Sequence, residues 1–132
     1  MSKAKLLVVD DEPDMLDFVE RVMRRRFDVT RCTSAEEAMT ALDGGDYEVL
    51  ITDQKMPRVS GLEMLDRIAG NYPRLVRILL SGFTDMPDIQ RALERRIVHG
   101  YVLKPVDSEK LIGAVNQAYR VRDGEPFEPL SD

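Results

Sequence analysis

The sequence predicts an α/β fold, in which five helices cover a doubly wound, five-stranded parallel sheet. Short apolar runs rich in Val, Ile and Leu recur along the chain, and each is too short to form a helix. Segments with the helical spacing of apolar residues separate these runs, so that strand and helix alternate strictly. Such alternation favours parallel strands joined by right-handed helical crossovers, with helices on both faces of the sheet.

Five segments are expected to be strands. Four are continuous apolar runs, as is typical of strands buried on both faces of a parallel sheet: 6–9, 49–51, 78–80 and 101–103. In the fifth, residues 28–33, the positions of Val29, Arg31 and Thr33 alternate with those of Thr30 and Cys32, so the segment is less apolar than the other four. We expect this weaker strand at an edge of the sheet.

The segments between the strands have the apolar spacing of one-sided surface helices. Two of them begin with Ser-x-x-Glu, at Ser34 and Ser60, where the hydroxyl and the carboxylate can each accept a free backbone N–H. Gly44 and Gly45 are expected to end the second helix, and Gly70 the third. The residues expected to face the core are Met15, Phe18, Val19, Val22 and Met23, then Ala35, Ala38, Met39 and Leu42, then Leu62, Leu65 and Ala69, then Ile89, Leu93 and Ile97, and finally Leu111, Val115 and Ala118.

Length and composition predict one domain in a reducing compartment. The chain has 132 residues, enough to bury a core without disulfides, and its single Cys32 excludes an intrachain disulfide. No apolar run is long enough for a signal peptide or a membrane span. The net charge of −5 argues against direct binding to nucleic acid or to an anionic membrane. We expect a cytoplasmic protein with a folded domain over residues 1–121, and a linker or flexible C-terminal tail over residues 122–132.

Charged and polar side chains follow the predicted strands. Asp10 and Asp11 end the first, Asp53 the third, Ser81 the fourth and Lys104 the fifth. Because ligands of open α/β sheets bind at the carboxyl ends of the strands, we expect these side chains to converge. Clustered carboxylates repel one another unless a cation is present, and their oxygens suit Mg²⁺. A lysine and a hydroxyl beside them suit a phosphoryl group, and the central Asp53 is the expected nucleophile.

Four motifs at these strand ends resemble those of a known family. They are Val8-Val-Asp-Asp-Glu-Pro13, Thr52-Asp-Gln-Lys-Met-Pro57 with Ser60-Gly61, Leu80-Ser-Gly82, and Tyr101-Val-Leu-Lys-Pro105. In this order and spacing they resemble the receiver domain of two-component response regulators, the family that includes the chemotaxis protein CheY. The resemblance covers about residues 4–121. It implies a flavodoxin/CheY-like sheet with strand order 2-1-3-4-5 and a receiver domain within residues 1–121.

The resemblance also implies a function. A receiver is a phosphorylation-activated switch that accepts a phosphoryl group from the phosphohistidine of a sensor histidine kinase or a phosphotransfer protein. It catalyses only its own phosphotransfer and dephosphorylation, and is a regulator rather than an enzyme acting on another substrate. The implied partners downstream are an effector protein or a C-terminal output domain. A phosphorylation-dependent dimer through the fourth helix, fifth strand and fifth helix is also expected, and contact with nucleic acid or membrane is not.

By position, the resemblance assigns the phosphoacceptor and the metal ligands. Asp53 matches the phosphorylated aspartate. Asp11 matches a direct Mg²⁺ ligand, and Asp10 a ligand that acts mainly through water. Asp53 itself and the backbone carbonyl of Lys55 complete the expected set, and Mn²⁺ can substitute for Mg²⁺. The side chain of Lys55 is also a flexible cation that can reach the phosphoryl group or the attacking water.

The resemblance further assigns the residues that respond to phosphorylation. Ser81 matches the hydroxyl that turns toward the phosphoryl oxygens, and Lys104 matches the lysine that pairs with them. Tyr101 matches the aromatic residue that changes rotamer when the hydroxyl moves. His99 matches no such role, and we expect it to be an ordinary residue in a loop or at a strand start. Residues with structural places in the motifs are Pro105, expected after a cis peptide bond, Pro57 and Gly61.

Three other classes of function fit part of this pattern. A phosphatase of the haloacid dehalogenase type uses a similar strand-end aspartate, but it needs a second Asp two residues later, where this sequence has Lys55. A flavodoxin-like FMN carrier needs a phosphate loop rich in Ser, Thr and Gly, where this sequence has Asp10-Asp-Glu-Pro-Asp14. A receiver-like docking module that works without phosphorylation is the third alternative, although all five key positions are intact.

Overall fold

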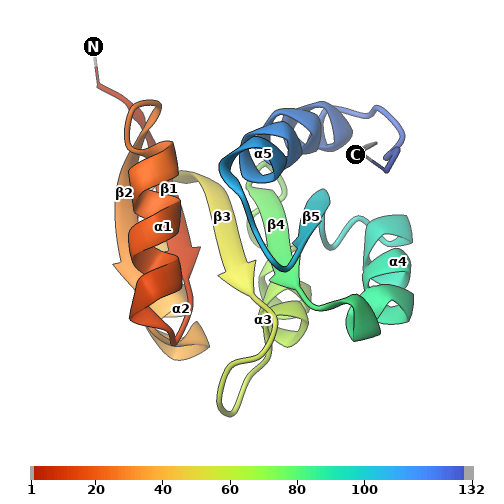
Figure 1. The fold of residues 1–132 in the computed structure, drawn as a ribbon, viewed down its shortest axis with the longest axis horizontal. Helices are drawn as coiled ribbons and strands as arrows, with labels where there is room; N and C mark the ends of the chain where they lie inside the picture. Colours follow the sequence, from red (N-terminus) through yellow and green to blue (C-terminus); the bar gives the residue numbers. More distant parts are fainter. Residues whose placement is uncertain (1, 130–132) are drawn as a thin grey trace.

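The computed structural model describes residues 2–129, and it contains one five-stranded parallel sheet with helices on both faces (Figure 1). The sheet order is β2-β1-β3-β4-β5, which confirms the predicted fold class and strand order. The weaker predicted strand, β2, lies at one edge, where its alternating side chains are partly exposed. The strands are β1 (Ala4–Val9), β2 (Phe27–Cys32), β3 (Tyr47–Asp53), β4 (Val76–Ser81) and β5 (Gly100–Leu103).

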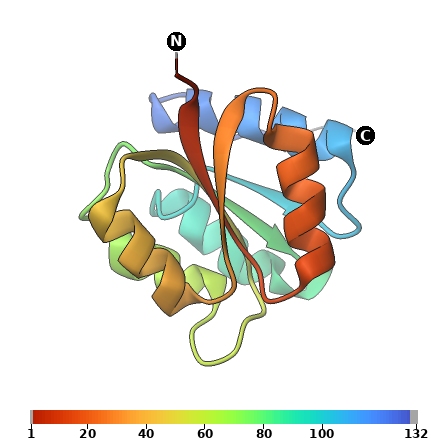
Figure 2. The same ribbon diagram turned by 90° about the vertical axis from the view of Figure 1, so that its left-hand side faces the viewer.

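Two hydrophobic cores lie on opposite faces of the sheet, one beneath α1 and α5 and the other beneath α2, α3 and α4 (Figures 1 and 2). A 3-10 turn, η1, leads from β4 into α4. Within residues 2–129, no helix combines the length and the apolar character needed to cross a bilayer. The helical elements are α1 (Pro13–Met23), α2 (Ala35–Gly44), α3 (Gly61–Ile68), η1 (Phe83–Asp85), α4 (Met86–Glu94) and α5 (Ser108–Arg122).

The buried stripe of α1 differs from the predicted one. Leu16, Val19 and Met23 are buried, whereas Met15 and Phe18 pack at the margin of the core and are only partly buried. The apolar positions of this helix span a wider arc than the surface that the sheet offers. The buried face of α1 therefore includes Leu16, which was not among the predicted core residues.

Both Ser-x-x-Glu boxes begin helices, but only one forms in full. At α3, Ser60 Oγ accepts from the N–H of Glu63 at 3.2 Å, and Glu63 Oε1 accepts from the N–H of Ser60 at 3.3 Å. At α2, Ser34 Oγ accepts from the N–H of Glu37 at 3.1 Å. The Glu37 carboxylate, however, accepts from the N–H and hydroxyl of Thr33. The predicted reciprocal bond at Ser34 is therefore wrong, because Thr33 offers that carboxylate two donors.

The last helix continues through Arg122, one residue beyond the expected domain end. Arg122 Nη1 donates to the carbonyl of Arg74 at 3.1 Å, and Arg122 Nε pairs with Asp123 at 3.0 Å. The first of these contacts ties the end of α5 to the loop between α3 and β4. The following residues turn back along α5, and residues 130–132 of the expected tail lie outside the described part of the chain.

Candidate functional site

Residues from four strand ends meet at one edge of the sheet. Asp10 and Asp11 follow β1, Asp53 ends β3, Ser81 ends β4, and Lys104 follows β5. In the register, Asp53 pairs with Leu80, and Ser81 pairs with Leu103, so the strands end nearly level. The parallel topology therefore brings these residues to the same edge, as expected from the sequence.

Three carboxylates form a tight cluster at this edge, because oxygens of Asp10, Asp11 and Asp53 lie within 4.8 Å of one another. Asp10 and Asp53 are buried, and Asp11 is exposed. Asp10 Oδ1 accepts from the N–H of Glu12 at 2.9 Å, whereas Asp10 Oδ2 is buried and has no hydrogen-bond partner within residues 2–129. A buried carboxylate oxygen without a donor indicates a place that a cation would complete.

The electrostatics of the cluster disfavour its fully ionised form. Burial raises the pKa of Asp10 to about 6, and the negative charge of Asp53 adds to this effect, while the N–H of Glu12 and the charge of Lys104 oppose it. An added cation would therefore favour the charged form of Asp10. The donor set of hard oxygens, with one orphaned and buried, fits a divalent cation such as Mg²⁺.

Lys104 supplies a positive charge directly at the central carboxylate. Its Nζ lies 2.6 Å from Asp53 Oδ1, and the Asp53 side chain is only 3% exposed. Partial burial alone would lower the pKa of Lys104, but the hydrogen bond and the charge of Asp53 raise it. The N–H of Lys104 also donates to the carbonyl of Ser81 at 2.8 Å, which holds this backbone against the end of β4. The peptide bond between Lys104 and Pro105 is cis.

The hydroxyl of Ser81 is hydrogen-bonded to Asp85 and not to a carboxylate of the cluster. Its Oγ donates to Asp85 Oδ2 at 2.5 Å, with the carbonyl of Gly82 at 3.2 Å. Asp85 stands immediately before α4, where an aspartate commonly caps the helix, yet its side chain makes no capping bond. Asp85 was not among the site residues predicted from the sequence. Its position four residues after Ser81 was the only signal, and that position does not reveal which partner the carboxylate takes.

The loop after Asp53 depends on a close backbone approach. The N–H of Gly61 donates to the carbonyl of Gln54 at 3.0 Å, and a Cβ at Gly61 would lie 2.3 Å from the carbonyl oxygen of Asp53. Glycine is therefore required where α3 starts. Lys55 and Pro57 lie exposed in this loop. Lys55 is two residues from Asp53, and the role of its backbone carbonyl as a metal ligand stays a prediction.

The ring of Tyr101 lies half-buried on β5 and has an aromatic partner from the end of the chain. Its centroid is 5.5 Å from that of Phe127, and the two ring planes meet at 37°. In the sheet register Tyr101 pairs with Leu79 of β4, the strand that ends at Ser81. Phe127, the single aromatic residue in the proline-containing segment after α5, was not among the residues predicted from the sequence.

Two buried polar residues, Arg77 and His99, lie at the opposite ends of β4 and β5 from the carboxylates. His99 Nδ1 accepts from the N–H of Arg77 at 3.0 Å, and burial lowers the pKa of His99 to about 3. Burial also lowers the pKa of Arg77. Its guanidinium joins two loops of the chain by donating to backbone carbonyls of Tyr72, Leu75, Arg96 and Ile97.

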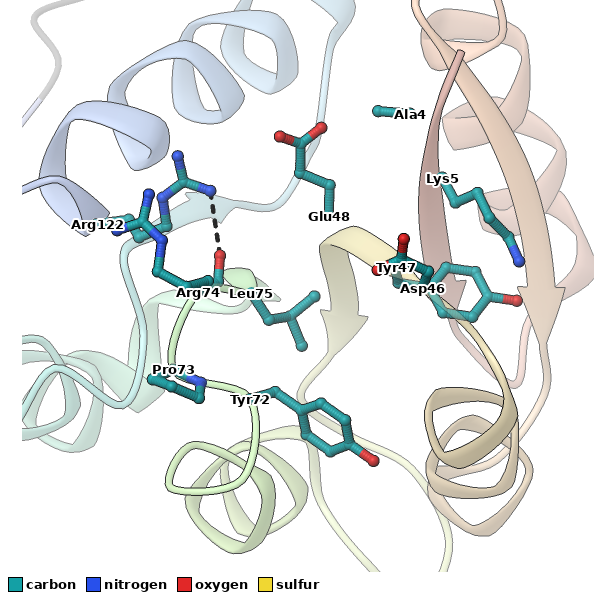
Figure 3. A pocket seen from close by; sticks show the side chains of 10 residues that line it. All are labelled: Ala4, Lys5, Asp46, Tyr47, Glu48, Tyr72, Pro73, Arg74, Leu75 and Arg122. Carbon is teal, nitrogen blue, oxygen red and sulfur yellow. Dashed lines mark hydrogen bonds between the residues drawn. The ribbon is translucent and has the colours of Figure 1, made fainter. Parts of the chain in front are cut away.

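An open groove lies at the amino-terminal edge of the sheet, remote from the carboxylate cluster (Figure 3). Its volume is about 540 Å³, and its wall mixes charged and aromatic side chains, including Lys5, Tyr47, Tyr72 and Glu48. Lys5 Nζ lies 4.6 Å from the centre of the Tyr47 ring, so this lysine is already engaged with the wall. The strand-end residues predicted from the sequence do not line this groove.

Comparison with known proteins agrees with the motifs. The sequence matches the family model of the response regulator receiver domain over residues 6–116. It is 37% identical to the hydrogenase transcriptional regulatory protein HoxA of Cupriavidus necator over 116 residues, which are 88% of this chain and 24% of that protein. It is 29% identical to the response regulator protein PilR of Pseudomonas aeruginosa, over 100% of this chain and 30% of that protein. The chain therefore spans only about a quarter to a third of the length of these relatives.

Solved structures show the same fold. A response regulator receiver domain protein of Clostridium thermocellum superimposes with a TM-score of 0.81 at 29% identity, over 91% of this chain and 97% of that one. The chemotaxis response regulator CheY4 of Vibrio cholerae has a TM-score of 0.79 at 22% identity, over 89% of this chain and 99% of that one, which supports the fold alone. The motifs, the family match and the fold together show that the chain belongs to the receiver domain family of two-component response regulators, the phosphorylation-activated switches of those systems.

Proposed function

We propose that Asp53 accepts a phosphoryl group from the phosphohistidine of a sensor histidine kinase or a phosphotransfer protein. The observation that carries this proposal is the setting of Asp53, a buried carboxylate paired with Lys104 at 2.6 Å beside two further carboxylates. In the transfer, an Asp53 oxygen forms a bond to phosphorus as the bond between phosphorus and the histidine nitrogen breaks. The histidine ring keeps the electron pair of that bond.

Lys104 has two parts in this step. Before transfer, its ammonium group holds Asp53 Oδ1 in one orientation, and the burial of Asp53 limits the access of water. After transfer, the acyl phosphate carries about 1.5 to 2 negative charges, and the ammonium group pairs with the phosphoryl oxygens. Positioning and charge neutralisation are the main requirements of phosphoryl transfer, and this lysine contributes to both.

The proposed metal ligands are the carboxylates of Asp10, Asp11 and Asp53 and the backbone carbonyl of Lys55. The orphaned Asp10 Oδ2 and the raised pKa of Asp10 support a cation at this place. When bound, Mg²⁺, or Mn²⁺ in its place, would neutralise charge on the transferring phosphoryl oxygens.

The proposed response to phosphorylation starts at Ser81. The phosphoryl oxygens compete with Asp85 for the Ser81 hydroxyl, which at present bonds to Asp85. Once Ser81 turns, the packing beside β4 changes, and Tyr101 on the neighbouring strand changes rotamer with it. The surface formed by α4, β5 and α5 then differs between two populated conformations.

We further propose a regulatory role without a separate enzymatic substrate, in the cytoplasm, with residues 1–121 as the receiver. HoxA and PilR are named as regulatory proteins and are several times longer than the matched segment. This supports an output through an effector protein or through a C-terminal output domain. The surface of α4, β5 and α5 is the proposed place for a phosphorylation-dependent dimer.

The phosphatase alternative is not favoured, because the exposed Lys55 occupies the position where such an enzyme needs an acidic group. The phosphorylation-independent docking module is separated from our proposal by a single experiment. The chain is incubated with acetyl phosphate and Mg²⁺, and its intact mass is measured. We expect one added phosphoryl group in the wild type and in the exposed control Asp43→Asn, and none in Asp53→Asn. An unmodified wild type, or equal modification of Asp53→Asn, would show that the acceptor is wrongly assigned.

A further inference from the structure

The segment after α5 folds back onto the domain. Gly124 adopts a φ of 115°, a left-handed conformation that reverses the chain at low cost only for glycine. The N–H of Gly124 donates to the carbonyl of Val121 at 3.1 Å, and the N–H of Glu125 donates to that of Arg120 at 3.0 Å. Further along, Gln117 Nε2 donates to the carbonyl of Glu128. We name residues 124–128 the C-terminal strap.

The strap places an aromatic ring on the tyrosine of β5. Phe127 is half-buried, while its neighbours Pro126 and Glu128 are exposed. Its ring stacks at a tilt against Tyr101, with centroids 5.5 Å apart. A pair of rings at this distance lies within the range of favourable aromatic contacts. Among residues 123–129, Phe127 alone is held partly out of solvent, so the position of the strap depends strongly on the ring of Tyr101.

Away from Phe127, the strap is held mainly by polar contacts. A cavity of about 130 Å³ separates it from α5, lined by side chains of both, including Gln117, Val121 and Pro126. The ion pair between Arg120 Nε and Glu125 Oε2 spans 3.7 Å on the exposed surface, where such pairs contribute little. A segment with few buried apolar contacts opens at low free-energy cost. Loss of the Tyr101 contact would leave the hydrogen bond from Gln117 Nε2 to the carbonyl of Glu128 as the contact that holds the far end of the strap.

We propose that the strap is a phosphorylation-dependent cover of the surface formed by β5 and α5, docked while Asp53 is unmodified and released when Asp53 is phosphorylated. The inference rests on the proposed function, because the release signal is the rotamer change of Tyr101. The strap occupies this surface in the unmodified chain, so a partner that binds to the ring of Tyr101 must displace Phe127. Phosphorylation removes this internal competitor and so exposes the surface.

The chain contains no tryptophan, which allows a direct test. The substitution Phe127→Trp places a single indole against Tyr101. The full chain is treated with acetyl phosphate and Mg²⁺, the extent of modification is read from intact mass, and the emission and acrylamide quenching of the indole are recorded. We expect a red shift and stronger quenching on phosphorylation, and neither change when Asp53→Asn is added. The control Tyr72→Trp, in the groove of Figure 3, should show neither change.

The outcomes separate the strap from the proposed function. Full phosphorylation with unchanged emission of the Phe127→Trp chain would overturn the strap and leave the phosphoacceptor in place. If the wild type is not phosphorylated at all, the proposed function fails, and the strap is judged by adding Tyr101→Ala to the Phe127→Trp chain. That change should by itself produce the red shift and stronger quenching, while Tyr101→Phe, which keeps the ring, should not. An unaltered spectrum with Tyr101→Ala overturns the strap.

Discussion

The hydroxyl of Ser81 donates to a carboxylate oxygen of Asp85 at 2.5 Å, although Ser81 ends β4, the strand beside β3 and its terminal Asp53. The hydroxyl expected to meet a phosphoryl group is thus already bonded to another acceptor. Two acceptors, the Asp85 carboxylate and the phosphoryl oxygens, compete for one hydrogen atom. The strength of the first bond sets how readily the second one forms.

Weakening the bond between Asp85 and Ser81 is expected to speed phosphorylation. In Asp85→Asn the hydroxyl loses a charged acceptor, which costs the resting arrangement about 1 kcal/mol and corresponds to about a fivefold shift in population. The rate of phosphorylation by acetyl phosphate, followed by intact mass, should rise by a similar factor. The control Asp88→Asn removes an exposed carboxylate that pairs with Arg91 on α4, and should leave the rate unchanged. An equal rate in Asp85→Asn and the wild type would contradict the competition.

Neutralising Asp10 is expected to stabilise the metal-free protein. Its folded pKa of about 6 lies above the ordinary value of 3.8, so the fold favours the protonated form. The associated stability is fully present below about pH 3.8 and is lost as the pH rises through 6. Asp10→Asn keeps the acceptor for Glu12 without the charge, and should raise the free energy of unfolding at pH 7.5 by on the order of 2 kcal/mol.

Magnesium should reverse the order of stability of the wild type and Asp10→Asn. Ligand binding to the folded state raises the melting temperature of the wild type, and Asp10→Asn should lose most of that rise. Thermal unfolding is measured for both chains with chelator and with saturating Mg²⁺. The proposed cation site would be contradicted by a wild-type melting temperature that is the same in both conditions.

A methyl group at Gly61 is expected to damage the loop after Asp53. The new Cβ would meet the backbone carbonyl oxygen of Asp53 at 2.3 Å, so the backbone must move. Gly61→Ala should lower the free energy of unfolding by on the order of 2 kcal/mol and slow phosphorylation of Asp53. Gly70→Ala, with open space around the new Cβ, is the matched control. Chemical denaturation of the three chains measures the difference, and an equal loss in both variants would argue against the steric cause.

Acid should destabilise the fold partly through His99. Because burial lowers its pKa to about 3, the unfolded chain binds a proton between pH 6.5 and 3 that the folded chain does not. Stability from the neutral ring is fully present above about pH 6.5 and is lost as the pH falls toward 3. His99→Gln can still accept the N–H of Arg77 and should flatten the pH dependence of unfolding over this range. Denaturation curves at several pH values test this, and an unchanged slope would exclude His99 as its source.

Much of the candidate site could be predicted because it follows from topology. Continuous apolar runs identify strands buried on both faces, and helices between them impose a parallel order. The carboxyl ends of such strands lie at one edge, so Asp10, Asp53 and Lys104 had to meet there once the strands were assigned. The meeting of these residues needed no knowledge of side-chain conformation.

Several contacts around the site were decided by the tertiary structure. Asp85 is a helix-capping type of residue that bonds to Ser81 instead, and Phe127 belongs to a proline-containing segment yet packs on Tyr101. Arg77 lies in a strand that is otherwise apolar up to Ser81. Its burial is compensated by four backbone carbonyls that accept from its guanidinium, two from the segment just before β4 and two from the segment after α4.

The sequence by itself determined the fold class and the edge at which the acidic cluster, Ser81 and Lys104 gather, because apolar periodicity and chain connectivity are local properties. The order of the strands followed from the resemblance of the motifs to those of receiver domains. Only the tertiary structure decided which acceptor holds Ser81 and what covers Tyr101. The first depends on the rotamers of Ser81 and Asp85, and the second on the reversal of the chain after α5. Both are determined by contacts that exist only in the folded molecule.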